Sequence, residues 1–122
     1  MAKAVERPDF VKVGYLPCTI EFVENEEWKK RPIFAEHGGD GGLFIGAHGT
    51  IYLRYDEESH EQNLRETLLH EILHAVWFVT ELSQENAKEW EDPEERVVGR
   101  SSGLLLDVLQ SNPKVFKYLT SP

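Results

Sequence analysis

The chain has 122 residues, of which 40% are hydrophobic and 29% are charged, and this is enough for one globular domain over residues 1–122. Its formal net charge of −9 and its scattered basic residues argue against nucleic-acid binding, because contacts to phosphate require clustered lysines and arginines. No apolar run approaches the length of a membrane span, and the N-terminus lacks the apolar segment of a secretion signal.

The sequence contains a single cysteine, Cys18, which lies in an apolar run. One cysteine excludes a disulfide within the chain, and this is typical of proteins in a reducing compartment. We therefore expect a cytoplasmic protein with no membrane partner, in which Cys18 is a small buried side chain.

Three segments in the first half of the chain predict a small sheet. Residues 11–23, 43–47 and 50–55 are rich in β-branched and aromatic residues, and the last of them alternates between apolar and polar positions. Residues 1–10 are polar and contain Pro8, so we expect a loosely ordered lead-in there. Because the strand at 50–55 leads into the next helix, we expect it to border a cleft, where a free edge could pair with an extended peptide.

The connections between these strands are less regular. Residues 24–31 predict a turn or a short helical piece, with Trp28 as its buried side chain. Residues 36–42 are rich in glycine and predict a flexible loop, on which His37 is expected to be solvated. The loop lacks the Lys-Ser/Thr ending of a phosphate-binding loop, so we expect no nucleotide site.

A long helix is predicted to begin just after Ser59, because Ser59 and Gln62 form the pattern of a capping box. From Leu68 to Val79 this helix is apolar on almost every side, so we expect it to be buried in the middle of the domain. Its apolar positions recur at intervals of three and four, at Leu64, Leu68, Ile72, Ala75, Val79 and Leu82.

A second helix is predicted to begin at Asp92-Pro93 and to end at Asn112-Pro113, where a last short helix starts. These elements together predict an α+β fold, in which a small antiparallel or mixed sheet packs on the first long helix and on this second, C-terminal helix. The predicted buried stripe of the second helix consists of Val97, Val98, Leu104, Leu105, Val108 and Leu109.

The first long helix carries the pattern His-Glu-x-x-His at His70, Glu71 and His74. Because a helix advances roughly 100° per residue, the two histidines lie one above the other on one face, where both imidazoles can reach one metal ion. Glu71 points to the side of the pair, at the place where a general base for hydrolysis would contact water beside the metal. The pattern therefore predicts a zinc site on this helix.

A catalytic zinc site needs a third protein ligand besides the two histidines. No histidine follows His74, so a ligand from the C-terminal side must be an acidic residue. Glu94 and Glu95 in the first turn of the second helix are the best candidates, and the helix face favours Glu95 over Glu94. A competing interpretation makes Glu95 part of a capping box with Asp92. On the N-terminal side the alternatives are His37, His48 and His60.

The segments 68–75, 94–98 and 109–113 are similar to small metallopeptidase-like proteins encoded by bacteriophages. With its motif helix and a later glutamate, the chain resembles the gluzincin branch of the zincin metallopeptidases, and its size resembles the minimal zincins. A weaker resemblance is to the repressor-cleaving metallopeptidases of mobile elements. The resemblance spans about residues 50–119 and implies a zincin-like domain, which would lie in the host cytoplasm if a bacteriophage encodes the chain. It also implies zinc bound by His70, His74 and Glu95, with Glu71 as general base.

The leading functional hypothesis is a zinc-dependent peptidase, in which Glu71 takes a proton from a zinc-activated water and the substrate is a peptide or protein. The alternative is a binding module, in which a zincin scaffold holds zinc and a peptide or protein partner without catalysis. The side chains considered for contact with the oxyanion or the substrate are His48, Tyr52, Arg54 and Tyr118.

Overall fold

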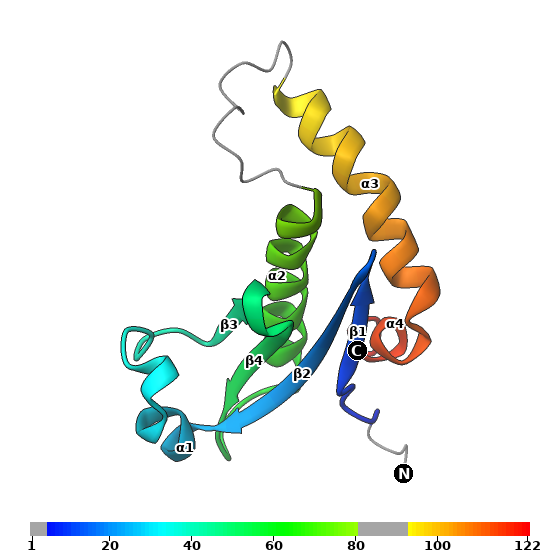
Figure 1. The fold of residues 1–122 in the computed structure, drawn as a ribbon. Coiled ribbons are helices and arrows are strands. Elements are labelled where there is room, and N and C mark those ends of the chain that lie inside the picture. Colours follow the sequence, from blue (N-terminus) through cyan, green and yellow to red (C-terminus); the bar gives the residue numbers. More distant parts are fainter. Residues whose placement is uncertain (1–4, 81–92) are drawn as a thin grey trace.

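The computed structural model describes residues 5–80 and 93–122, which form a four-stranded mixed sheet with helices packed against it (Figure 1). This confirms the predicted α+β fold. In chain order the elements are β1 (Phe10–Val13), β2 (Leu16–Glu24), α1 (Asn25–Lys30), the 3-10 helix η1 (Pro32–Phe34), β3 (Gly42–Ile45), the 3-10 helix η2 (Gly46–His48), β4 (Thr50–Tyr55), α2 (Glu61–Thr80), α3 (Pro93–Ser111) and α4 (Pro113–Leu119).

The strand order in the sheet is β1-β2-β4-β3. The segment predicted as one strand at 11–23 is a hairpin, because the chain turns at Gly14, whose φ of 62° suits glycine. Strand β4 pairs with β2 in parallel and with β3 in antiparallel orientation, so it has no free edge. The sequence left open whether the strand at 50–55 has a free edge. It is an interior strand of the sheet, and β3 is the edge strand on that side.

The main core lies between the sheet and the helices α2, α3 and α4. Helix α2 packs on β3 and β4, while α3 packs on β1 (Figure 1). Cys18 is fully buried in this core, as predicted, and burial raises the pKa of its thiol to about 11. The buried members of this core are Val11, Val13, Cys18, Ile20, Ile51, Leu53, Leu68, Ile72, Ala75, Val76, Val108, Val115 and Tyr118.

A second, smaller core covers the opposite face of the sheet. Trp28 on α1 stacks on Phe34 at 3.9 Å between ring centroids, and Phe34 meets Tyr52 of β4 edge to face. Tyr52 faces this side because side chains alternate along a strand. The predicted burial of Trp28 on a short helix is thus confirmed.

Helix α2 is buried on one side only. Leu68, Ile72 and their neighbours face the sheet, whereas Leu69, Leu73, Trp77 and Phe78 are 39–44% exposed. The expectation that the helix is buried all round is therefore wrong for this face. The sequence is apolar on both sides, but the sheet and the neighbouring helices cover only one of them.

Asn112 joins the end of α3 to the sheet. Its side-chain oxygen accepts a hydrogen bond from the Lys12 N–H at 2.8 Å, and its amide nitrogen donates to the Lys12 and Val108 carbonyls. The predicted break at Asn112-Pro113 is confirmed, although the side chain bonds to β1 and does not cap α4.

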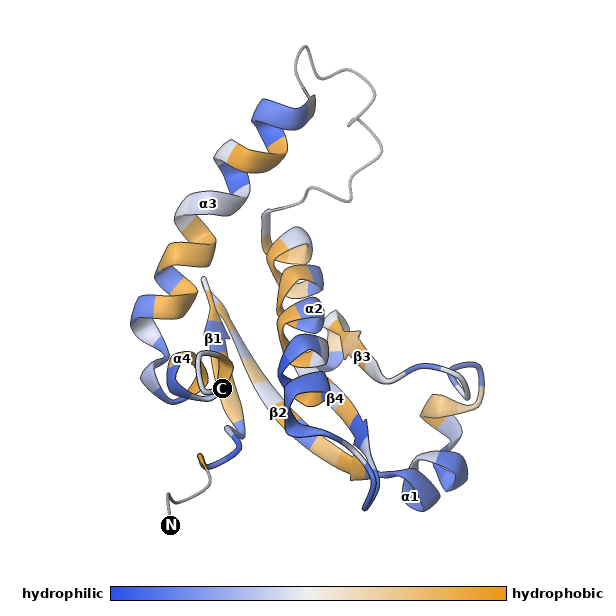
Figure 2. Ribbon diagram, turned by 180° about the vertical axis from the view of Figure 1, so that it is seen from behind, coloured by the Kyte–Doolittle hydropathy of each residue, from blue (hydrophilic) through white to orange (hydrophobic). Residues whose placement is uncertain are grey.

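The predicted start of α3 at Asp92 lies outside the described residues. Figure 2 shows the apolar and polar bands that alternate along α3.

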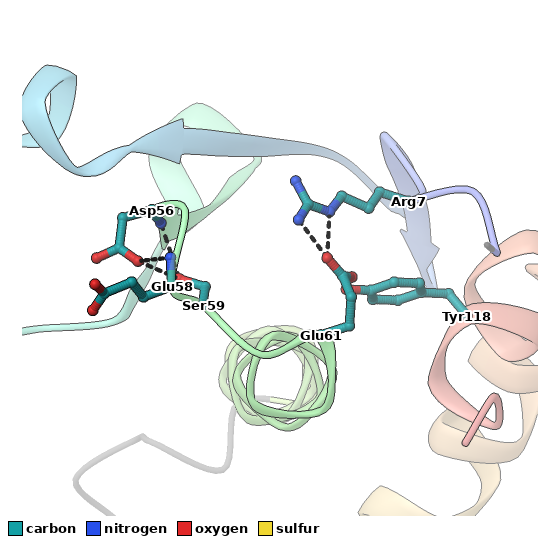
Figure 3. Close-up of polar contacts among 6 residues, drawn as sticks. All are labelled: Arg7, Asp56, Glu58, Ser59, Glu61 and Tyr118. Atoms are coloured by element: carbon teal, nitrogen blue, oxygen red, sulfur yellow. Dashed lines mark hydrogen bonds and ion pairs between the residues drawn. The ribbon is translucent and has the colours of Figure 1, made fainter.

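The N-terminal turn of α2 is fixed by polar contacts on two sides (Figure 3). On one side the Ser59 hydroxyl exchanges hydrogen bonds with Asp56, in place of the predicted capping box. On the other side Glu61 forms an ion pair with Arg7 and accepts a hydrogen bond from the Tyr118 hydroxyl at 2.7 Å. The segment before β1 is thereby connected to α2 and α4.

Within the two described ranges, none of the helices combines the length and the apolar composition that crossing a lipid bilayer requires.

Glu61 makes the stability of the fold depend on pH. The hydrogen bond from Arg7, with help from Tyr118, holds the pKa of Glu61 below its ordinary value of 4.5. A lowered carboxyl pKa adds stability above the unfolded pKa, and this stability disappears as the pH falls through the folded pKa. We expect Glu61→Gln to cost about 1 kcal/mol of unfolding free energy at pH 7 and much less at pH 3.

Urea unfolding at both pH values measures this difference, with Glu58→Gln as the control because Glu58 is exposed on the adjacent turn (Figure 3). An equal loss of stability at both pH values would show that the charge of Glu61 does not contribute.

Candidate metal centre

His70 and His74 lie one turn apart on the exposed side of α2, as the helical spacing predicted. Their Nε2 atoms are 3.2 Å apart and their rings cross at 70°. Two nitrogens bound to one tetrahedral zinc at about 2.05 Å are roughly 3.3 Å from each other. The imidazole pair therefore has the spacing that a shared metal ion requires.

Glu71 occupies the boundary between α2 and the edge strand β3. It is only 5% exposed, and its carboxylate accepts a hydrogen bond from the Phe44 N–H. Burial raises the pKa of Glu71, while the imidazoles of His74 and His70 and the Phe44 N–H act in the opposite direction. The carboxylate is thus held in a dry position beside both histidines.

One ligand atom from each of His70, Glu71 and His74 lies within 4.8 Å of the others, so this group could hold a metal ion. Among the described residues the group includes neither Glu94 nor Glu95, which are both exposed in the first turn of α3. The choice of Glu95 as third ligand stays a prediction. The alternatives His37, His48 and His60 also lie outside the group.

The motif faces a cleft of about 1240 Å³ between α2 and a wall formed by β3 and the loop before it. The glycines of this wall allow a close approach. A Cβ on Gly42 would lie 2.8 Å from Thr67 Cγ2 and 3.1 Å from Glu71 Cγ, and a Cβ on Gly46 would lie 2.6 Å from the Phe78 ring. The absence of side chains at these two positions lets β3 pack directly on α2.

The loop in this wall is held by side chains from the opposite side of the sheet. The Trp28 indole donates to the His37 carbonyl at 3.1 Å, and the Arg54 guanidinium donates to the Gly38 carbonyl at 2.5 Å. His37 Nδ1 lies 2.8 Å from Asp40 Oδ2. His37 and Asp40 therefore line the cleft as a hydrogen-bonded pair, and the His37 side chain is still 35% exposed.

The side chains considered for contact with the oxyanion are outside the cleft lining. Tyr52 packs on Phe34, Arg54 holds the loop, Tyr118 bonds to Glu61, and His48 is exposed on η2. The residues that do line the cleft come from 37–46 and from α2, and include His37, Asp40, Phe44, Glu66, Trp77 and Phe78. No local sequence pattern marks these residues, because the two walls are brought together by long-range packing.

Comparisons of this chain with protein-family models, with curated proteins and with solved structures find no match. The structure shows the His-Glu-x-x-His group on a helix, and the resemblance to gluzincins has no further support from relatives. Function is therefore inferred from the geometry of the site.

The packing of β3 on α2 can be tested with a pair of glycines. Gly42→Ala places a methyl group against Thr67 and Glu71, whereas a Cβ on Gly41 meets nothing within 4 Å. We expect Gly42→Ala to lower the unfolding free energy by about 1–3 kcal/mol and Gly41→Ala to leave it nearly unchanged. Urea unfolding of both variants measures this, and equal stabilities would contradict the close approach.

Zinc affinity tests the metal centre. We expect the wild-type protein to bind about one zinc per chain, and His70→Ala or His74→Ala to weaken binding by roughly 100-fold or more. His48→Ala, an exposed histidine outside the group, should bind zinc normally. Competition titration with a chromophoric chelator gives the affinities.

The same titration of Glu95→Gln and Glu94→Gln tests the third ligand. The variant that binds zinc more weakly identifies the ligand. If both variants bind zinc as tightly as the wild-type protein, neither glutamate is a ligand.

Proposed function

We propose that this chain is a zinc-dependent peptide-bond hydrolase, with zinc held by His70 and His74 and by Glu95 as the predicted third ligand. The observation that carries the proposal is the 3.2 Å spacing of the two Nε2 atoms next to a buried carboxylate. This donor set matches the preference of zinc for imidazole and carboxylate ligands. Bound zinc supplies Lewis acidity, which polarises a carbonyl group and makes water more acidic.

Glu71 is the general base in this proposal. Burial raises its pKa and so makes it a stronger proton acceptor than an exposed glutamate. The Phe44 N–H favours the charged form of the carboxylate, and Glu71 lines the cleft. Glu71 therefore accepts a proton from water and returns it to the leaving amine.

The edge strand supports a peptide as the substrate. Among residues 5–80 and 93–122, strand β3 pairs only with β4, and it lines the cleft along the motif face of α2. An extended peptide can add to such an edge through main-chain hydrogen bonds, which bring its carbonyl groups beside the motif. A cleft of about 1240 Å³ is larger than most small-molecule pockets and accommodates several peptide residues.

A binding module that holds zinc and a peptide without catalysis is the second candidate. It is favoured by the position of the side chains considered for contact with the oxyanion, since His48, Tyr52, Arg54 and Tyr118 all lie outside the cleft lining. Without such a donor, the same cleft would bind a peptide or protein partner and release it unchanged.

We also propose that the protein acts in the cytoplasm, which would be the host cytoplasm if a bacteriophage encodes it. Cys18 is a buried free thiol, and a chain without a disulfide suits a reducing compartment.

Replacing the proposed base separates hydrolysis from binding. In Glu71→Gln the imidazole pair is intact, so we expect zinc to remain bound while peptide cleavage falls by about 100-fold or more. Zinc content and the cleavage of a fluorogenic peptide library measure the two effects, with Glu58→Gln as an exposed control. Cleavage at the wild-type rate in Glu71→Gln would remove Glu71 from the mechanism. The absence of cleavage by zinc-loaded wild-type protein would favour the binding module.

A further inference from the structure

The two ends of the cleft differ in chemistry. At one end lie the carboxylates of Glu66 on α2 and Asp40 on the loop before β3. At the other end lie the aromatic rings of Trp77 and Phe78 on α2 and of Phe44 on β3. His70 and His74 are between the two ends because they lie between Glu66 and Trp77 along the helix.

The edge strand runs from the acidic end to the aromatic end. Gly42 at its start lies against Thr67 and Glu71, and Gly46 just after its end lies against Phe78. Strand β3 and helix α2 are therefore side by side and run in the same direction. A peptide that extends along β3 would pass the acidic end, the histidine pair and the aromatic end in turn.

The aromatic end offers apolar surface that the fold leaves uncovered. Leu73, Trp77 and Phe78 are 39–44% exposed, and Phe78 meets the Phe44 ring at 5.6 Å between centroids. A group of large apolar side chains exposed inside a cleft is typical of a binding site for an apolar group.

The acidic end attracts positive charge. Glu66 is exposed and forms no ion pair within the part of the chain that the structure describes, and Asp40 is bonded to His37. The chain as a whole has a net charge of −9, which adds to the negative potential of the cleft. A lysine or arginine side chain complements this end.

We infer that the cleft binds an extended peptide segment in which a lysine or arginine and a large apolar residue are about four positions apart. Glu66 and Trp77 are separated by about 16 Å along the helix axis. At about 3.3 Å per residue this span corresponds to about five positions of extended chain. A separation of four spans about 13 Å, keeps both side chains on one face of the peptide, and leaves about 3 Å that the long side chains of a lysine and an aromatic residue cover. The inference rests on the proposed function, because it names the substrate class of the same cleft.

Binding of labelled seven-residue peptides tests this inference without the need for turnover. The parent peptides are Ala-Lys-Ala-Ala-Ala-Phe-Ala and its reverse sequence, each compared with versions that carry Glu in place of Lys or Ala in place of Phe. Fluorescence anisotropy gives the dissociation constants for zinc-loaded Glu71→Gln protein and for metal-free wild-type protein. For the better of the two orders, we expect Phe-to-Ala to weaken binding about tenfold or more and Lys-to-Glu about threefold or more.

Variants of the protein show which end of the cleft is responsible for the preference for Lys and which for the preference for Phe. Trp77→Ala should remove most of the dependence on Phe, and Glu66→Lys should reverse the preference for Lys over Glu. Leu106→Ala and Glu58→Lys, at exposed positions outside the cleft lining, should keep both preferences. Circular dichroism checks that each variant is folded. The inference is overturned if the dissociation constants do not depend on the Lys or the Phe of the peptide. It is also overturned if the preferences for these residues are unchanged in Trp77→Ala and Glu66→Lys.

Cleavage of the same peptides by zinc-loaded wild-type protein separates this inference from the proposed function. Selective binding without cleavage contradicts hydrolysis and supports the peptide class. Cleavage at rates independent of Lys and Phe supports hydrolysis and overturns the peptide class.

Discussion

The close approach of α2 to the edge strand β3 determines the geometry of the site. Because Gly42 and Gly46 have no side chains, the strand packs directly on the helix, and this contact sets the rotation of α2 about its axis. Once Leu68 and Ile72 face the sheet, the helical period places His70 and His74 on the open side. Glu71 falls at the boundary between the two sides, where it is buried but still lines the cleft. The helix fixes the three motif residues relative to one another, and the packing of α2 on the sheet fixes which of them are exposed and which is buried.

This contact has an energetic consequence at Glu71. Removing a carboxylate from water is unfavourable unless it gains hydrogen bonds or opposite charge, and burial is the main reason why the pKa of Glu71 is raised. The Phe44 N–H and the neighbouring imidazoles offset part of this cost. A residue selected for stability alone would be apolar here, as its neighbours Leu68, Ile72 and Ala75 are. A carboxyl group in this position is typical of functional sites, where perturbed pKa values concentrate.

The sequence predicted the features that depend on local periodicity. The α+β class, the strands near 43–47 and 50–55 and the pairing of the two histidines follow from spacings of two, three or four residues, and the break at Asn112-Pro113 follows from the proline. Strand order does not follow from local spacing. Strand β4 lies between β2 and β3, which are consecutive strands in the chain, so the edge strand on that side is β3 and not the strand at 50–55. The place of the 36–42 loop at the cleft could not be predicted for the same reason, since the contacts that hold it come from Trp28 and Arg54.

The misjudged face of α2 has a different physical cause. Apolar composition shows that Leu73, Trp77 and Phe78 avoid water, but it does not show whether the fold or a ligand covers them. In the structure they remain partly exposed on the side of the helix that carries the histidines. A peptide seated along β3 would cover these side chains and exclude water from Glu71 and the imidazoles at the same time. Since electrostatic interactions strengthen when water is excluded, the apolar end of the cleft and the polar chemistry at its centre would be coupled through the same bound chain.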